Sequence, residues 1–345
     1  MSKAEKKEAK ARTAFVYSDR LASFDYGESH PMKPERLRLT AELIGALGLD
    51  KLPSSKFVEA RSATTEELLL FHTPEYLKIL KEADSGLIPA DGAQHGLGYS
   101  DNPVFKGVFE WSVLCAGASL QAAELVASGK AEIAFNISGG LHHAMPERAS
   151  GFCYINDAAV AIKYLAGLGK RVAYVDIDAH HGDGVEAAFY STDSVLTVSV
   201  HETGEWLFPG TGAAADTGVG AGRGFSVNVP LPPSAGDELF LKAMDEVVVP
   251  VVKDFAPDIL VTQLGVDTFE TDPITHLRLT TNGFEKAVSR FREMNLPWVA
   301  LGGGGYDIGN VARAWTLAWA IMNDVEAPNI IPQDFLRRKN GIFRN

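Results

Sequence analysis

The segment from Arg171 to Gly184 concentrates residue types that bind metal ions and move protons. It reads RVAYVDIDAHHGDG, and its apolar part, Val172 to Val175, is typical of a strand buried on both faces of a sheet. Because alternate side chains of an extended chain point to the same side, Asp176, Asp178 and His180 can point into one space. Two carboxylates and an imidazole in that space suit a divalent metal ion, with zinc as the first candidate.

A third metal ligand is expected from another strand end. Asp267 in the segment GVDT follows an apolar run and is the best candidate, although a turn or a helix cap also uses aspartate at such a position. Three protein ligands leave one position of a tetrahedral zinc ion open, which is the arrangement of catalytic rather than structural zinc. An open position admits water and a carbonyl oxygen, so the ion can lower the pKa of the water and polarise the carbonyl.

Two adjacent histidines, His142 and His143, follow a glycine pair after another apolar run. They could ligate metal or lie exposed in a loop, but the Asp-His-Asp set already fills a site. We therefore interpret them as proton-transfer groups. Each needs a carboxylate on its second ring nitrogen, and Asp176 and Asp183 remain for that purpose.

One tyrosine and two phenylalanines complete the candidate site. Tyr306 follows four consecutive glycines, 302–305, and this flexible backbone can bring its hydroxyl to a carbonyl oxygen opposite the metal, in the role of an oxyanion hole. Phe152 and Phe208 lie in the loop segments GFCY and LFPGTG. They can line a slot for an aliphatic stem, or they can simply join the core.

The elements that must position these residues are short β-like runs that alternate with helical patterns. This alternation predicts a mostly parallel sheet with helices on both faces. Five of the runs are followed by loops rich in glycine and polar residues, and ligands bind at the carboxyl ends of strands in open α/β sheets. We expect these loops to converge on one site in one domain, because no linker divides the chain. The predicted strands are Thr13–Tyr17, Ile133–Ile137, Val172–Ile177, Val195–Val200, Phe225–Val229, Ile259–Leu264 and Trp298–Leu301, and the predicted helices are Glu35–Leu47, Glu66–Phe71, Pro74–Ala83, Phe105–Ser128, Asn156–Leu165, Glu238–Phe255 and Gly283–Met294.

The composition argues against several classes of protein. With 345 residues, 46% hydrophobic residues and a formal charge of −12, the chain can form a large core but does not suit direct binding to nucleic-acid phosphates. Its two cysteines, Cys115 and Cys153, imply no disulfide framework and fit a reducing compartment. The N-terminus lacks a secretory signal and no apolar run has membrane-span length, so we expect a cytoplasmic protein without membrane association. Residues 1–11 are expected to form a disordered or frayed Lys-rich tail.

From Asp25 to Trp315 the chain resembles the zinc-dependent histone deacetylases and their prokaryotic relatives, the acetoin-utilisation type deacetylases. The resemblance rests on motifs in the family's order: HPMKPERLRLT, GGLHHA, ASGFCYIND, VDIDAHHGDGVEAAFY, FPGTG and LGGGGY. It implies the arginase/deacetylase fold, a central parallel sheet of about eight strands, in a single deacetylase domain over residues 12–345.

The resemblance also implies roles for individual residues. The implied zinc ligands are Asp178, His180 and Asp267, with ferrous iron left open as the native metal. The implied catalytic residues are His142 supported by Asp176, His143 supported by Asp183, and the carbonyl-polarising Tyr306. The implied substrate-binding residues are Gly151, Phe152 and Phe208 along a lysine tunnel, Asp101 and Ile274 at its mouth, and Arg36 in an internal channel for acetate.

Two structural potassium sites are implied in the same way. The first would use Asp176, Asp178, His180, Ser199 and Val200, and the second would use the backbone carbonyls of Phe189, Thr192, Val195 and Phe225. One family feature is not expected. Lys33 remains, but Pro273 and Gly309 stand where corepressor-bound members place arginines for inositol phosphate, so an inositol-phosphate or corepressor partner is not expected.

The expected reaction is hydrolysis of an Nε-acyl-lysine amide in proteins, with acetylpolyamine hydrolysis on the same site as the alternative. An arginase-like two-metal enzyme fits less well, because Gly182 and Phe269 stand where that mechanism needs further carboxylates. A non-catalytic binder of acyl-lysine or acetate is also disfavoured, since no metal ligand, histidine or tyrosine of the site is missing.

Overall fold

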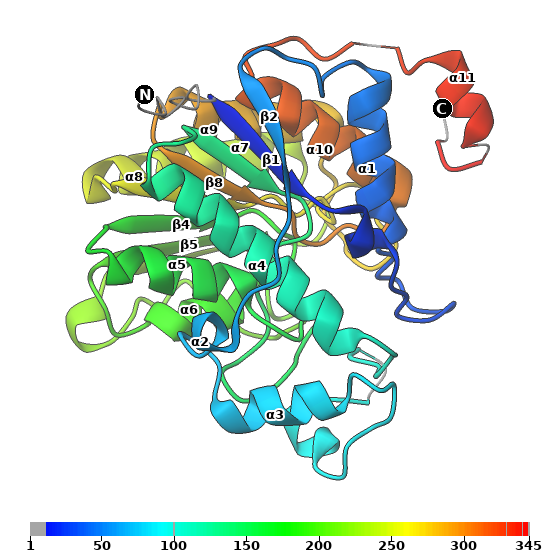
Figure 1. Cartoon of the computed structure of the whole chain (residues 1–345). Helices are drawn as coiled ribbons and strands as arrows, with labels where there is room; N and C mark the ends of the chain where they lie inside the picture. Colours follow the sequence, from blue (N-terminus) through cyan, green and yellow to red (C-terminus); the bar gives the residue numbers. More distant parts are fainter. Residues whose placement is uncertain (1–11, 99–100, 329, 340, 344–345) are drawn as a thin grey trace, which may run out of the picture.

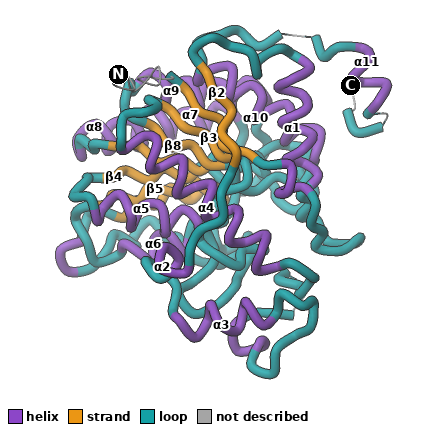
Figure 2. The backbone as a smooth tube through the Cα atoms, viewed as in Figure 1, coloured by secondary structure: helices purple, strands orange, loops and turns teal. Residues whose placement is uncertain are grey.

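The apolar runs of the sequence pair into one sheet of eight strands, all parallel, with the spatial order β2-β1-β3-β8-β7-β4-β5-β6 (Figures 1 and 2). The computed structural model describes residues 12–98, 101–328, 330–339 and 341–343. The tail predicted for residues 1–11 lies outside them. The strands are β1 Thr13–Tyr17, β2 Ser55–Glu59, β3 Ile133–Asn136, β4 Val172–Asp176, β5 Val195–Glu202, β6 Ser226–Leu231, β7 Ile259–Gln263 and β8 Trp298–Leu301.

Helices cover both faces of this sheet (Figure 1). On one face lie α4 Val108–Ala127, α5 Asp157–Gly167 and α6 Asp183–Phe189, and on the other lie α1 Glu35–Ala46, α7 Asp237–Ala243, α8 Val249–Phe255, α9 Thr281–Glu293 and α10 Ile308–Met322. The short helices are α2 Thr65–Leu68, α3 Pro74–Glu82 and α11 Gln333–Arg338. The predicted parallel α/β architecture is therefore confirmed, with β2, α6, α10 and α11 as additions.

The prediction of one continuous helix from Glu238 to Phe255 is wrong. The structure divides it into α7, a π-helical turn at Met244–Val248 and α8. Pro250 lies in the first turn of α8, directly after the π-helical turn, and it has no N–H to donate to that preceding turn. The backbone accommodates it by widening the helix locally.

The core lies between the sheet and its two helical layers. The central strands β3, β4, β7 and β8 are buried along their whole length. Burial on both faces explains why these strands read as continuous apolar runs rather than as alternating patterns. Since every strand is parallel, all carboxyl ends lie at one edge of the sheet, and the loops that carry the polar motifs leave from that edge.

Candidate active site

Asp178, His180 and Asp267 converge at the carboxyl edge of the sheet. Asp178 and His180 follow β4, and Asp267 follows β7, the strand paired with β4. The Nδ1 atom of His180 lies 3.0 Å from Oδ1 of Asp178 and 3.0 Å from Oδ2 of Asp267. The three side chains are buried, and one ligand atom from each lies within 4.8 Å of the others. Ligands bound to one zinc ion are separated by roughly 3–3.5 Å, so this arrangement fits a single divalent ion.

Hydrogen bonds hold the outer oxygens of both carboxylates. Oδ2 of Asp178 accepts hydrogen bonds from Nε2 of Gln263 and the backbone N–H of Gly304, both at 2.7 Å. Oδ1 of Asp267 accepts one from the N–H of Ala179 at 2.8 Å. These contacts aim the remaining oxygens at His180, as in metal sites whose ligands are oriented by a surrounding shell of hydrogen bonds.

The charges of this cluster favour a cation. Burial alone would lower the pKa of His180, but Asp178 and Asp267 raise it to about 10. Burial, together with the charge of Asp178, raises the pKa of Asp267 to about 6. Two buried carboxylates at one point favour positive charge nearby, and a divalent ion would supply it.

His142 and His143 form a pair beside these groups, and each is tied to a carboxylate. Nδ1 of His142 lies 2.7 Å from Oδ2 of Asp176, and Nδ1 of His143 lies 2.7 Å from Oδ1 of Asp183. Because a carboxylate only accepts hydrogen bonds, each Nδ1 carries hydrogen, and Nε2 of a neutral ring is left as an acceptor. The two Nε2 atoms are 3.0 Å apart.

The two histidines differ in protonation. Burial lowers the pKa of His142, but the carboxylates of Asp176 and Asp178 outweigh this and raise it to about 9. Burial and the neighbouring His142 lower the pKa of His143 to about 4. At neutral pH His142 is therefore protonated and positively charged, and His143 is a neutral imidazole.

The start of α5 holds the loop that carries these histidines. Asp157 accepts hydrogen bonds from two backbone N–H groups of the loop, at 2.8 and 2.9 Å. Nδ2 of Asn156 donates to the carbonyls of His142 and Ala144, both at 3.1 Å. Neither residue was singled out in the sequence, and Gln263 was also missed. Their common signal is a polar residue at the end of a buried strand or the start of a buried helix.

The glycine run 302–305 leads from β8 to the candidate tyrosine. A Cβ atom on Gly304 would lie 2.1 Å from Oδ2 of Asp267 and 2.7 Å from Oδ2 of Asp178. Gly303 and Gly305 have φ angles of +128° and +131°, which side-chain-bearing residues rarely adopt. Gly304 is therefore required because the candidate metal-ligand carboxylates lie against its backbone, and Gly303 and Gly305 are required by their backbone conformation.

Tyr306 and Arg36 are fixed on either side of this run. The N–H of Tyr306 donates to Oδ2 of Asp272 at 2.8 Å, a partner that the sequence did not indicate. The guanidinium of Arg36 is buried and donates to the carbonyls of Gly303 and Gly305, both at 2.8 Å. Burial raises the pKa of Tyr306 well above its ordinary value, so its phenol keeps the proton that an oxyanion-hole donor needs.

Phe152 and Phe208 lie on the open side of the site. The ring of Phe152 packs against Tyr306 with centroids 5.6 Å apart, and the ring of Phe208 packs against His143 at 5.0 Å. A Cβ atom on Gly151 would lie 2.4 Å from the ring of His143 and 2.9 Å from that of Phe208. Both rings and Gly151 thus border the catalytic candidates, and Phe208 remains 42% exposed.

The two residues predicted at the mouth lie further out. Asp101 is exposed, and its carbonyl lies 3.3 Å from Nε2 of His30, whose ring packs on Phe152 at 4.6 Å. Ile274 is half-buried, and its N–H donates to Oδ1 of Asp272 at 3.1 Å, the carboxylate that also holds the tyrosine. Each is connected to the site through one intervening residue.

The residues predicted for the first potassium site cluster next to the histidine pair. Asp176 and Ser199 are register partners on β4 and β5. Oγ of Ser199 lies 2.9 Å from Nδ1 of His201. Val200 follows on β5.

The four carbonyls predicted for the second potassium site lie at the opposite edge of the sheet. They belong to the end of α6, the turn after it, the first residue of β5 and the residue before β6: Phe189, Thr192, Val195 and Phe225.

The positions where the family's inositol-phosphate ligands would lie are otherwise engaged. Nζ of Lys33 donates to the carbonyls of Gly27 and Glu28 at 2.8 and 2.7 Å. Gly309 lies under the backbone of Ile342, whose carbonyl oxygen would be 2.6 Å from a Cβ atom.

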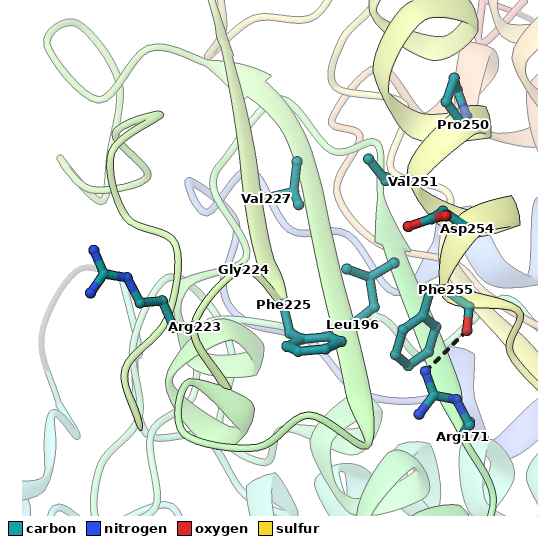
Figure 3. Close-up of a pocket in the computed structure, with 10 residues that line it drawn as sticks. All are labelled: Arg171, Leu196, Arg223, Gly224, Phe225, Val227, Pro250, Val251, Asp254 and Phe255. Atoms are coloured by element: carbon teal, nitrogen blue, oxygen red, sulfur yellow. Dashed lines mark hydrogen bonds between the residues drawn. The ribbon is translucent and has the colours of Figure 1, made fainter. Parts of the chain in front are cut away.

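A cavity of about 560 Å³ lies at the other end of the sheet from the candidate active site, between β5, β6 and α8 (Figure 3). Its floor is apolar, and the guanidinium of Arg171 lies over the ring of Phe255 at 4.2 Å and donates to that residue's carbonyl at 3.1 Å. Its other charged lining residues are Arg223 and Asp254. The histidines and metal-ligand candidates are all absent from this lining, so the chemistry of the molecule is concentrated at the opposite edge.

One set of candidate metal ligands and a carboxylate-supported histidine pair lie at this edge of the sheet, with the half-buried Tyr306 directly after the glycine run. This combination can activate water, transfer its proton and stabilise an oxyanion, which is the equipment of a hydrolase.

Comparison with known proteins agrees with this class. The model of the histone deacetylase domain matches residues 30–322. The acetoin utilization protein AcuC of Bacillus subtilis (strain 168) is 40% identical over 332 residues, covering 94% of this chain and 85% of that protein. The histone deacetylase RPD3 of Saccharomyces cerevisiae is 38% identical over 326 residues, covering 94% and 74%. The crystal structure of an HDAC homolog from Aquifex aeolicus superimposes with a TM-score of 0.89 at 38% identity, covering 94% of this chain and 88% of the other.

The chain therefore belongs to the histone deacetylase family, as its motifs indicated, and is a hydrolase of that family. Among the residues that the structure describes, no helix combines the length and the apolar character needed to cross a bilayer.

Proposed function

We propose that this protein is a zinc-dependent lysine deacetylase that hydrolyses the amide of Nε-acetyl-lysine, or a related acyl-lysine, in proteins. The observation that carries the proposal is the position of His142 and His143. Both are anchored to carboxylates through Nδ1, their Nε2 atoms lie 3.0 Å apart, and the ring of His143 lies 5.8 Å from that of His180 in the metal-ligand cluster.

The metal would be held by Asp178, His180 and Asp267, whose donor set suits zinc and also ferrous iron. When bound, it would supply a Lewis acid for the acyl oxygen and lower the pKa of an attacking water.

The histidine pair would move the protons of the reaction. His143, the neutral member, accepts the proton of water as the new C–O bond forms at the acyl carbon. The C–N bond then breaks, and a histidine of the pair returns a proton to the leaving lysine amine, so the products are acetate and free lysine. His142, charged and tied to Asp176, contributes a fixed positive charge beside the developing oxyanion.

The remaining residues would bind and orient the substrate. The stem of the acyl-lysine passes between Phe152 and Phe208, with the carbonyl of Gly151 beside it. The hydroxyl of Tyr306 donates a hydrogen bond to the oxyanion. We assign Asp101 to the rim, where it holds substrate backbone amides, Ile274 to the tunnel mouth, where it tunes specificity, and Arg36 to an internal path for acetate.

Further features of the proposal concern the whole protein. We propose potassium at the two sets of residues described above, a single domain over residues 12–345, and a cytoplasmic location. For the first potassium set, support comes from Ser199, because a hydroxyl that donates to His201 keeps lone pairs for a cation. An inositol-phosphate partner is not part of the proposal, since Gly309 is covered by Ile342.

The test is a panel of substrates offered to protein reloaded with zinc or with ferrous iron. Acetyl-lysine peptides, peptides with longer acyl groups and N-acetylputrescine are compared by release of free amine. We expect kcat/KM to be higher for an acetyl-lysine peptide than for N-acetylputrescine. The reverse order would establish the acetylpolyamine alternative, and no release from any substrate would establish a non-catalytic binder.

A further inference from the structure

A buried polar cluster lies behind the metal-ligand candidates, and none of the proposed catalytic steps uses it. It is centred on His181, which follows His180 but points the other way, toward α6 and β6. Nε2 of His181 lies 3.5 Å from Oε2 of Glu186, and Nδ1 lies 2.8 Å from the hydroxyl oxygen of Thr211. His181 is 2% exposed, whereas Thr211 lies at the surface, so the cluster runs from the interior to the Phe208 side of the molecule.

Glu186 is itself fixed by the edge strand. Its Oε2 accepts hydrogen bonds from Nδ2 of Asn228 at 2.5 Å and from Oγ of Ser226 at 3.3 Å, both on β6. A small internal cavity adjoins these groups, and Oδ1 of Asn228 and Nε2 of His181 are buried in its lining without a hydrogen-bond partner among the described residues. Glu186 thus faces Nε2 of His181 as a charged acceptor at 3.5 Å without completing a hydrogen bond.

The negative charge of Glu186, 3.5 Å from Nε2 of His181, favours hydrogen on that nitrogen. A carboxylate only accepts, so Nε2, which faces it, carries the hydrogen. In the neutral ring Nδ1 is then an acceptor, and the hydroxyl of Thr211 donates to it. The carboxylate on α6 thus sets the direction of a hydrogen bond that ends on a loop after β5.

That loop, residues 203–212, is the Phe208 loop. At one end Phe208 packs on the ring of His143. At the other end the ring of His201 lies 4.8 Å from that of His181, and its Nε2 lies 3.0 Å from the carbonyl of Gly212. A Cβ atom on Gly212 would lie 2.4 Å from Nε2 of His201 and 2.7 Å from Cγ of His181, so this end of the loop lies directly on the two rings.

We propose that Glu186 and His181 are positioning residues that hold the Phe208 loop, through Thr211, in the place where it forms one wall of the substrate site. The cluster would act on substrate binding rather than on the bond-breaking step. This inference rests on the proposed function, since the wall matters only if an acyl-lysine stem packs against it.

The test begins with Thr211→Val, which keeps the shape of the side chain and removes the hydroxyl. We expect faster amide hydrogen exchange over residues 203–212, and a KM for an acetyl-lysine peptide raised by about 5-fold, the change that one hydrogen bond supports in an equilibrium. The value of kcat should change less than KM. Thr211→Ser, which retains the hydroxyl, should restore both readouts.

Two further variants make the result specific. Glu186→Gln keeps the side-chain volume but removes the negative charge and replaces a group that can only accept with one that can also donate, and it should loosen the same loop in the same direction. Thr217→Val makes the matched change outside the Phe208 loop and should leave exchange and KM at the wild-type values. Melting temperatures show that each variant is folded.

Several outcomes would overturn the inference. They are unchanged exchange and KM in Thr211→Val, an equal effect in Thr217→Val, or a loss of kcat with KM and exchange unchanged. If the wild-type protein turns over no acylated amine, the proposed function fails, and hydrogen exchange still decides whether the cluster holds the loop.

Discussion

The phenol of Tyr306 is the residue whose contribution can be isolated most cleanly. Its position depends on backbone contacts, through the N–H bond to Asp272 and the glycine run before it, so loss of the hydroxyl should leave the loop in place. We predict that Tyr306→Phe lowers kcat by roughly 10²–10³, the effect of removing one oxyanion donor, with a smaller change in KM. Steady-state kinetics on an acetyl-lysine peptide measures this. Tyr164→Phe on α5 is the matched control, and full activity in Tyr306→Phe would show that the hydroxyl has another role.

The three metal-ligand candidates allow a prediction about stoichiometry. We expect one divalent ion for each wild-type chain by elemental analysis, and loss of that ion in Asp267→Ala. Removal of the ion with a chelator should abolish activity and lower the melting temperature, because a ligand that binds only the folded state stabilises it. Two divalent ions per chain would instead favour an arginase-like site.

At the scale of elements, His72 connects the chain before α3 to the start of α5. Its Nε2 accepts the backbone N–H of Asn156 at 3.0 Å, and its Nδ1 faces the carbonyl of Pro146 at 3.3 Å. Burial lowers the pKa of His72 to about 4. Since the unfolded chain binds a proton near the ordinary value of about 6.5, protonation favours unfolding. The contribution of neutral His72 to the free energy of unfolding is fully present above pH 6.5 and is lost as the pH falls toward 4.

We therefore predict that the wild-type protein loses more stability than His72→Gln when the pH falls from 7.5 to 5. Glutamine keeps one acceptor and one donor but does not titrate. The difference between the two proteins should be about 2 kcal/mol, from the 1.5 pH units below the unfolded pKa. Urea unfolding at both pH values measures it. Equal losses would mean that His72 does not bind its proton in this range.

The elements also show what the sequence could reveal about the fold and the site. Runs such as those of β4 and β7 are predictable because strands buried on both faces are continuously apolar. The edge strand β2 was not predicted because its segment SKFVE is half-exposed and polar. The break before α8 was not predicted because the apolar spacing continues through Pro250.

Among site residues, those that follow strands in recognisable motifs could be identified. Gln263, Asp157 and Asp272 could not, because each acts through a backbone or carboxylate contact with a segment distant in sequence. Spacing along the chain reveals which residues share a strand end, but it does not reveal which hydrogen bonds cross from one strand end to the next.

At the scale of the whole molecule, the C-terminal arm, helix α11 with residues 341–343, closes over α1 and α10. Phe335 is buried in a small cluster with Leu39 and Leu43. Gly309, at the start of α10, lies beneath the carbonyl of Ile342. The arm therefore covers the helix that begins two residues after Tyr306.

We predict that Gly309→Arg displaces the arm. A side chain there meets the Ile342 carbonyl, and overpacking of this kind costs about 1–3 kcal/mol. The melting temperature should fall, and limited proteolysis should cleave near α11 sooner than in the wild type. Gly45→Arg on α1 is the matched control, because a Cβ atom there meets nothing within 4 Å. If Gly309→Arg has the melting temperature and the cleavage rate of the wild type, the arm can move aside without loss of stability.

The close approach of the glycine run to the carboxylates has a consequence for engineering. In a library randomised over positions 302–305, every active variant should carry glycine at position 304, because even a methyl group there displaces Asp267 or Asp178. Changes of substrate specificity would have to come from side chains further from the carboxylates, such as Phe208 and Ile274, whereas position 304 accepts no substitution.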